Sequence, residues 1–257
     1  MNETRGANGT VRTTSLSLRV VDALRRLNGG RIEEVAEEVG VAPSTAYRHL
    51  NTLRQHDYVV KRGDEYRVGL LFLSIGTYAR QQREHFELAQ EKVDDLAEQT
   101  GERAMFTVEE RGRRIHTCMA TGSDAVQAGK HVGYRGYLHP AASGKAILAE
   151  YPDERVHAIL DEWGLPARTE NTITDRETFM AELERVRERE YATNLEETTP
   201  GVRAIAVAAT TRNGRVLGAF NVSGPKRRMN GEWFQEDLPN VLLAKANEFE
   251  VDIEYAD

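Results

Sequence analysis

The most informative segment of this chain is Gly40–Leu50, which reads GVAPSTAYRHL. Its glycine supplies a tight corner after the acidic, amphipathic stretch Ile32–Val39, which is predicted to be a short helix. A further helix is predicted over residues 43–56, with apolar side chains recurring every three or four positions. Two short helices joined by such a corner form a helix-turn-helix.

The flanking residues extend this motif to a winged helix. Leu16–Leu27 has helical apolar spacing, with Ser15 or Ser17 as the expected cap, so a first helix precedes the pair. Tyr58–Val68 reads as strand, turn and strand, with Gly63-Asp64 at the turn. This order predicts a winged helix-turn-helix domain over residues 15–69, preceded by a flexible arm at 1–14.

The second helix of the pair begins with hydroxyls and a guanidinium. In a helix-turn-helix, the N-terminal residues of the second helix meet base edges in the major groove, and arginine can pair with guanine. Two cations at the hairpin tip suit phosphates or the minor groove. The residues predicted to contact double-stranded DNA are Ser44, Thr45, Tyr47, Arg48, Lys61 and Arg62. The alternative is that the hydroxyls only cap the helix and that the cations form a solvated surface.

The rest of the chain alternates strands and helices. A helical stretch at 70–84 is predicted to link the two domains and to offer a dimer contact. Hairpins are predicted around residues 109–114 and at Asn213-Gly214. The predicted helices span residues 85–100, 143–150, 154–163, 176–189 and 232–250. Antiparallel hairpins with helices between them predict an α+β domain over residues 85–257.

Composition excludes several classes of protein. The chain has 257 residues and 40% apolar residues, enough for a packed core, and Cys118 is its only cysteine. One cysteine excludes a disulfide framework, a zinc ribbon and dithiol chemistry. No apolar run reaches about 18 residues, and the polar N-terminus lacks the apolar core of a signal peptide. We therefore expect a cytoplasmic protein with no membrane partner.

The net charge is −7, and the charged residues are unevenly distributed along the chain. Residues 1–80 hold 12 Lys+Arg against 9 Asp+Glu, whereas residues 81–257 hold 22 against 32. A basic head on an acidic body favours a nucleic-acid-binding head. The cations are 28 arginines and 6 lysines, and excess acid with scarce lysine suits the high-salt cytoplasm of a haloarchaeon.

No catalytic constellation is evident. His116 and Cys118 alternate on a predicted strand and are expected to point the same way, but they lack an orienting third group. His131 and His139 lack a close third metal ligand and are expected to be solvent-exposed. The charged run 182–190 is interpreted as a solvated helix face. No catalytic residue, metal or cofactor is predicted; a metabolite enzyme with a regulatory head and a ligand-free architectural protein are the alternatives.

Several segments resemble the IclR-type transcriptional regulators. Leu16–Leu24 and Ala36–Leu50 are similar to the head of that family, and Leu138–Ala149, Arg187–Ala206 and Ala219–Pro225 are similar to motifs of its second domain. The resemblance implies a winged-helix head and a GAF-like effector-binding domain. It also implies dimers or tetramers that repress or activate transcription, for which a two-fold arrangement predicts palindromic operators.

The resemblance further implies an effector pocket. Carried over position by position, its lining residues are Ala125, Ala128, Ala142, Ser143, Asn194, Val202, Ala204, Asn221 and Ser223. The helix that opens at Ser143 offers free amides to a carboxylate or phosphate, and Asn221 and Ser223 face one side of a strand. The alternative is that these two polar residues are bonded locally.

The chain departs from the family pattern at two pocket positions. Many members have cysteine at the position of Ala204 and aspartate at or near that of Asn194, whereas both are neutral and less reactive here. A neutral, hydrogen-bonding pocket suits a hydroxylated ligand. We therefore expect the effector to be a sugar acid or another organic acid of a catabolic pathway.

Overall fold

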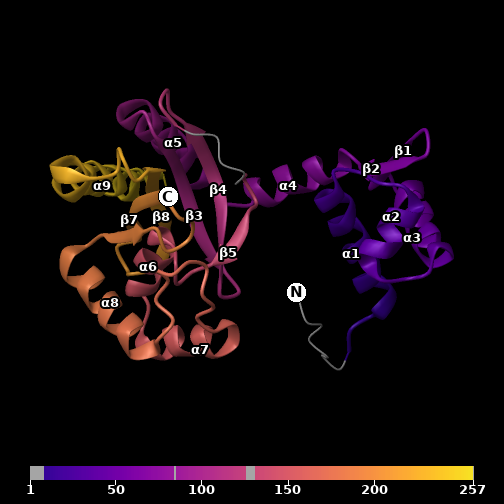
Figure 1. The fold of residues 1–257 in the computed structure, drawn as a ribbon. Helices are drawn as coiled ribbons and strands as arrows, with labels where there is room; N and C mark the ends of the chain where they lie inside the picture. Colours follow the sequence, from indigo (N-terminus) through magenta and orange to yellow (C-terminus); the bar gives the residue numbers. More distant parts are fainter. Residues whose placement is uncertain (1–8, 84, 126–130, 257) are drawn as a thin grey trace. The chain divides into compact units, whose positions relative to one another are not determined.

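The computed structural model describes residues 9–83, 85–125 and 131–256, and the chain divides into two compact units, Met1–Gln82 and Arg83–Asp257 (Figure 1). None of the described helices is long and apolar enough to cross a membrane.

The first unit is a winged helix-turn-helix, which confirms the fold predicted for the head. Its elements are α1 (Arg12–Leu27), α2 (Ile32–Val39), α3 (Pro43–Gln55), β1 (Val59–Arg62), β2 (Glu65–Val68) and α4 (Leu71–Gln81). Val20, Val35, Leu50 and Tyr66 belong to one buried cluster that joins the helices to the wing. Gly40 ends α2 with a φ of 75°, a left-handed conformation that glycine adopts without strain.

Helix α1 begins earlier than predicted. Its first residue is Arg12, so residues 12–14, assigned to a flexible arm, are helical. Ser15 and Ser17 do not cap it; their hydroxyls donate to the carbonyls of Val11 and Thr13, one turn back. Hydroxyls inside a helix commonly bond in this way. The prediction was wrong because periodicity registers only apolar residues, and this first turn is polar.

Helix α4 carries apolar side chains that the first unit leaves uncovered. Phe72 packs against Tyr58 of the head, with ring centroids 5.1 Å apart. Leu73 and Tyr78 remain 68% and 64% exposed, and none of the residues of α4 is buried. The helix therefore presents an apolar face, as expected for a contact between subunits.

The second unit is an antiparallel sheet covered on both faces by helices (Figure 1). Its elements are α5 (His85–Thr100), β3 (Arg103–Glu110), β4 (Arg113–Thr121), β5 (Arg135–Tyr137), α6 (Ala142–Ala149), α7 (Asp153–Trp163), α8 (Arg176–Arg189), β6 (Ala192–Leu195), β7 (Val202–Thr210), β8 (Val216–Pro225), the π-helical turn η1 (Trp233–Asp237) and α9 (Leu238–Ala256). The strand order is β5-β4-β3-β8-β7-β6. The α+β class is confirmed, and the two short edge strands, β5 and β6, are additions to the prediction.

The two faces of this sheet are packed differently. Helices α5 and α9 bury one face through an aromatic-rich cluster that includes Phe86, Phe106 and Phe249. Helix α6 covers the other face, where Ala204 and Ala206 lie beneath it. Small side chains on the sheet let the helix approach closely, so the start of α6 lies directly against the strands.

A bulge in β4 separates His116 from Cys118. The strand register shifts between Phe106 and Thr107, so that Phe106 pairs with Cys118 and Thr107 with His116. Cys118 belongs to the core beneath α5, whereas His116 accepts or donates a bond to the Thr107 hydroxyl, at 2.9 Å, on the opposite face. The expectation that both side chains point the same way was wrong, because an extra residue reverses the alternation.

A buried ion cluster fixes α6 in place. Lys145 is 1% exposed, and its Nζ lies 2.7 Å from Glu197 Oε1 and 3.7 Å from Glu182 Oε1. Glu182 also forms an ion pair with Arg189, whose Nη2 lies 3.0 Å from Glu182 Oε1. Glu182 is itself buried, so the charged run 182–190 is not wholly the solvated face that was predicted. The cluster ties α6 to α8 and to the turn after β6.

Replacing the lysine tests this arrangement. Lys145→Met leaves the buried carboxylate of Glu197 without its counter-charge, whereas Glu182 keeps its pairs with Arg185 and Arg189. We expect a loss of about 3–5 kcal/mol in the free energy of unfolding. Urea unfolding monitored by tryptophan fluorescence reads the second unit alone, since Trp163 and Trp233 are the only tryptophans. The control Arg212→Met removes an exposed pair with Glu254 and should cost less than about 1 kcal/mol.

The loss of stability caused by Lys145→Met should become smaller as the pH falls. Burial raises the pKa of Glu197, so the folded protein takes up a proton there more readily than the unfolded chain. A protonated carboxyl needs no lysine as a counter-charge, and the stability of Lys145→Met should approach that of wild type as the pH falls from neutral into the acidic range. A deficit that stays constant between neutral and acidic pH would contradict a role for the buried charges.

Candidate functional site

The first candidate surface is the N-terminal half of α3. Ser44, Tyr47 and Arg48 are exposed and Thr45 is half-buried, while Ala46 on the same helix faces the core. The N-cap of α3 is Ala42, and no side chain caps the helix. The two hydroxyls therefore do not serve as caps, so capping does not account for them.

The wing supplies the second part of this surface. Lys61 and Arg62 lie on β1 next to the turn, and both are exposed. Arg62 pairs in register with Glu65, and Lys61 Nζ lies 5.3 Å from the centroid of the Tyr66 ring. Neither cation forms an ion pair with another part of the described chain, so both charges are available to phosphates.

The second candidate site is an inner cavity between the sheet and the start of α6. Seven of the nine residues predicted for the effector pocket line it: Ala142, Ser143, Asn194, Val202, Ala204, Asn221 and Ser223. Met105, Arg114, Ala141 and Thr198 complete the lining. The volume is about 20 Å³, room for about one water molecule. The cavity is nearly closed in this conformation.

Two predicted pocket residues are not among the lining residues. Ala125 lies in the turn after β4, where its amide donates to the carbonyl of Gly122 at 3.2 Å. It does not line the inner cavity. That turn folds back on Gly101, whose carbonyl accepts the amide of Asp124, and the assignment of Ala125 to the effector pocket stays a prediction. Ala128 lies outside the described residues.

The polar groups of the inner cavity divide into two kinds. Asn194 is engaged by its own turn: its Nδ2 donates to Thr198 Oγ1 at 2.7 Å, and its Oδ1 accepts the amide of Glu197 at 2.7 Å. Asn221 receives only a long bond, 3.4 Å, from Thr107 Oγ1. No side chain caps α6, so its first amides lack intrahelical acceptors beside the cavity. Asn194 shapes the site, and α6 and Asn221 offer binding groups.

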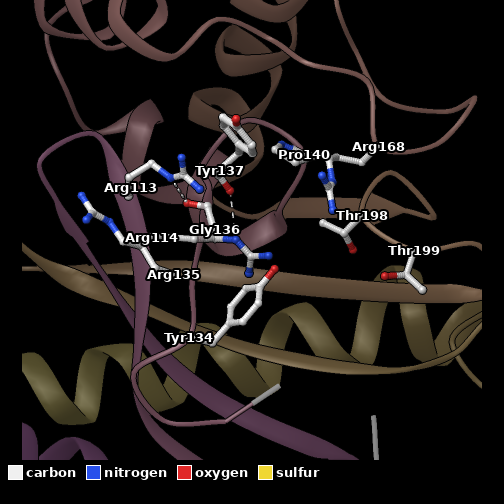
Figure 2. A pocket seen from close by; sticks show the side chains of 10 residues that line it. All are labelled: Arg113, Arg114, Tyr134, Arg135, Gly136, Tyr137, Pro140, Arg168, Thr198 and Thr199. Atoms are coloured by element: carbon white, nitrogen blue, oxygen red, sulfur yellow. Dashed lines mark hydrogen bonds between the residues drawn. The ribbon is translucent and has the colours of Figure 1, made fainter. Parts of the chain in front are cut away.

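An outer hollow adjoins the inner cavity and was missed by the sequence analysis (Figure 2). Its volume is about 240 Å³. It is lined by Arg113, Arg114, Tyr134, Arg135, Gly136, Tyr137, Pro140, Arg168, Thr198 and Thr199. We call it the arginine hollow. Arg114 and Thr198 line both spaces. The only signal in the sequence was the adjacent pair Arg113-Arg114, since Arg135 and Arg168 come from distant segments.

The histidines hold no metal site. His139 is 2% exposed rather than solvent-exposed as predicted, and its Nε2 lies 3.2 Å from the Pro166 carbonyl. Burial lowers the pKa of His139 to about 4, so the ring is neutral and Nε2 donates. His131 is exposed. No group of three potential metal ligands occurs within the described ranges.

A winged helix followed by a domain with a nearly closed cavity and an adjoining hollow is the arrangement of a DNA-binding regulator. The family description "IclR helix-turn-helix domain" matches residues 17–63, and "Bacterial transcriptional regulator IclR C-terminal" matches residues 78–249. The chain belongs to the IclR family of transcriptional regulators. Its relatives are named as transcriptional regulators, and the chain is accordingly a transcriptional regulator.

Three relatives illustrate the similarity. The probable HTH-type transcriptional regulator ArcR of Halobacterium salinarum is 31% identical over 93% of each chain. The glycerol operon regulatory protein of Streptomyces griseus is 30% identical over 82% of this chain and 85% of its own length. The crystal structure of an IclR homolog from Microbacterium hydrocarbonoxydans, complexed with 4-hydroxybenzoate, has a TM-score of 0.78 at 19% identity and covers 95% of this chain and 99% of that one.

The close packing of α6 generates a further prediction. A Cβ at Gly144 would overlap the carbonyl of Leu138, which is backbone and cannot move aside easily. Gly144→Ala should therefore displace the start of α6 and lower the free energy of unfolding by about 1–3 kcal/mol, measured by differential scanning calorimetry, which reports the unfolding of both units. Gly76→Ala is the control, because a Cβ there meets nothing within 4 Å. Equal stability of the two variants would show that α6 is not held by this contact.

Proposed function

We propose that this protein is a dimeric or tetrameric regulator of a catabolic pathway, controlled by a small organic acid bound beside the start of α6. We assign DNA binding to residues 15–69, the link to 70–84 and effector binding to 85–257. The observation that carries the proposal is the convergence of seven residues, from four elements and distant parts of the sequence, on one cavity. A sugar acid fits the neutral, hydrogen-bonding groups of Asn221 and Ser223.

The relatives support small-molecule control in a general way. One is named for a glycerol operon, and the solved homolog from Microbacterium hydrocarbonoxydans is complexed with 4-hydroxybenzoate. The nearly closed inner cavity suits a sensor, because a ligand that opens it would favour one conformation over another. A coupling of about 1–3 kcal/mol between effector and DNA is the usual range for such control.

The proposed mechanism begins with self-association. The exposed apolar face of α4 supplies a surface for a second copy, and a two-fold dimer carries two copies of α3. Two such helices read half-sites about one DNA turn or a multiple apart, so we expect palindromic operators. Effector binding would change the spacing of the two heads and so repress or activate transcription. A cytoplasmic location follows from the need to reach chromosomal DNA.

The test is genome-wide mapping of bound DNA with tagged protein. Arg48→Ala removes the guanidinium best placed to pair with guanine, and we expect occupancy of discrete palindromic sites to fall by about five- to a hundredfold. Arg54→Ala is the matched control; it removes an exposed arginine from the last turn of the same helix, where Arg54 binds Asn51. Loss of the same sites in both variants, or no discrete sites in wild type, would contradict the proposal.

A further inference from the structure

We propose that the arginine hollow binds the head group of a small dianion, a phosphate monoester or a dicarboxylate, through Arg114 and Arg168. The inference rests on the proposed function and deepens it, since it names the charge class of the effector. It differs from the expectation of a ligand held by neutral groups alone, because neither Arg114 nor Arg168 is among the residues predicted for the effector pocket.

The first support is a buried charge without a counter-charge. Arg114 is 5% exposed, and no carboxylate of the described chain forms an ion pair with it. Its Nε donates to the Tyr137 carbonyl at 2.9 Å, and its Nη1 lies 3.3 Å from His116 Nε2. Burial lowers the pKa of Arg114 to about 10, so the guanidinium remains protonated at neutral pH.

An uncompensated buried charge is costly, and the buried charges of Lys145, Glu182, Glu197 and Glu102 are paired. Lys145 has two carboxylates, and buried Glu102 receives Arg228 through two hydrogen bonds. Arg114 is the exception among these described groups, and it lies at the wall shared by two spaces. A bound anion supplies the missing counter-charge.

The second support is the set of residues that surround Arg114 in the hollow. Figure 2 shows the side chains of Arg114 and Arg168 directed toward the hollow, with the Tyr134 hydroxyl beside the Arg114 guanidinium and Arg135 directed away. Arg113 stacks on the ring of Tyr137, with its guanidinium 4.0 Å from the centroid, and adds positive potential nearby. No acidic residue of the described chain lines the hollow. This site is cationic within a segment, residues 81–257, that carries ten more acids than cations.

The arrangement selects for more than one negative charge. Two guanidiniums present several donors to the oxygens of a phosphate or of two carboxylates, and Thr198 and Thr199 add hydroxyls. A single carboxylate would neutralise only one of them. Because Arg114 and Thr198 also line the inner cavity, a ligand whose head lies in the hollow can extend a hydroxyl toward Asn221.

The test compares three-carbon ligands that differ in charge. Glycerol is neutral, glycerate carries one charge, and tartronate and glycerol 3-phosphate are the dicarboxylate and phosphate probes. Thermal unfolding of the full chain, followed by tryptophan fluorescence at constant ionic strength, measures stabilisation, and calorimetric titration measures affinity. We expect at least one dianion to bind about tenfold or more tightly than glycerate, and glycerol not to bind.

Three variants complete the test. Arg114→Met should weaken dianion binding by about ten- to a hundredfold, the range for a lost charged hydrogen bond. Arg168→Gln should weaken it similarly and changes only an exposed loop side chain, so it remains informative if Arg114→Met fails to fold. Arg212→Gln removes an exposed arginine elsewhere and should leave binding unchanged.

The outcomes separate this inference from the proposed function. Dianion binding that is lost in Arg168→Gln and retained in Arg212→Gln supports the inference, and the better dianion identifies the head group. Equal binding of glycerate and the dianions, or binding indifferent to Arg168→Gln, overturns the inference while the proposed sensor function stands. Absence of binding by every probe also overturns it, whereas the proposed regulation of DNA is judged separately by the mapped sites.

Discussion

The buried ion pair between Lys145 and Glu197 is the constraint on which the second unit depends. It joins the middle of α6 to the turn after β6, two segments that are 52 residues apart. The same turn presents Thr198 and is held by Asn194, so one cluster sets the position of the helix start and of the facing wall. A charge pair is directional, unlike the alanine contacts beneath α6, and it fixes where the helix lies along the sheet.

Much of the fold was predictable from the sequence, because a long amphipathic helix or a hairpin with a glycine turn has a pattern that is visible within its own segment. The winged helix followed from Gly40 and from the order of its neighbours. Edge strands of three or four residues, such as β5, are too short to establish a period. The bulge at the middle of β4 was invisible for another reason: it is defined by pairing with β3, a property that no single segment carries.

The site was predictable in part. The small and polar residues of the inner cavity were placed by resemblance to a family, and seven of them converge in the structure. The arginine hollow was not, because Arg114, Arg135 and Arg168 come together only when β4, β5 and the loop after α7 are assembled. The burial of charged residues could not be predicted either. Lys145 and Glu182 look like surface charges in the sequence, and their burial depends on ion pairs formed in the folded chain, Lys145 with Glu197 and Glu182 and Glu182 with Arg189.

The two charged sites of this protein should respond differently to salt. Lys61 and Arg62 are exposed, so the attraction to DNA phosphates that we propose for them should weaken steeply as salt rises, and the acidic second unit adds no attraction. Sequence-specific contacts from α3 must then carry more of the DNA affinity. Arg114 is buried, and buried charges are screened much less. The proposed binding of a small anion should therefore persist at ionic strengths where non-specific binding to DNA is lost.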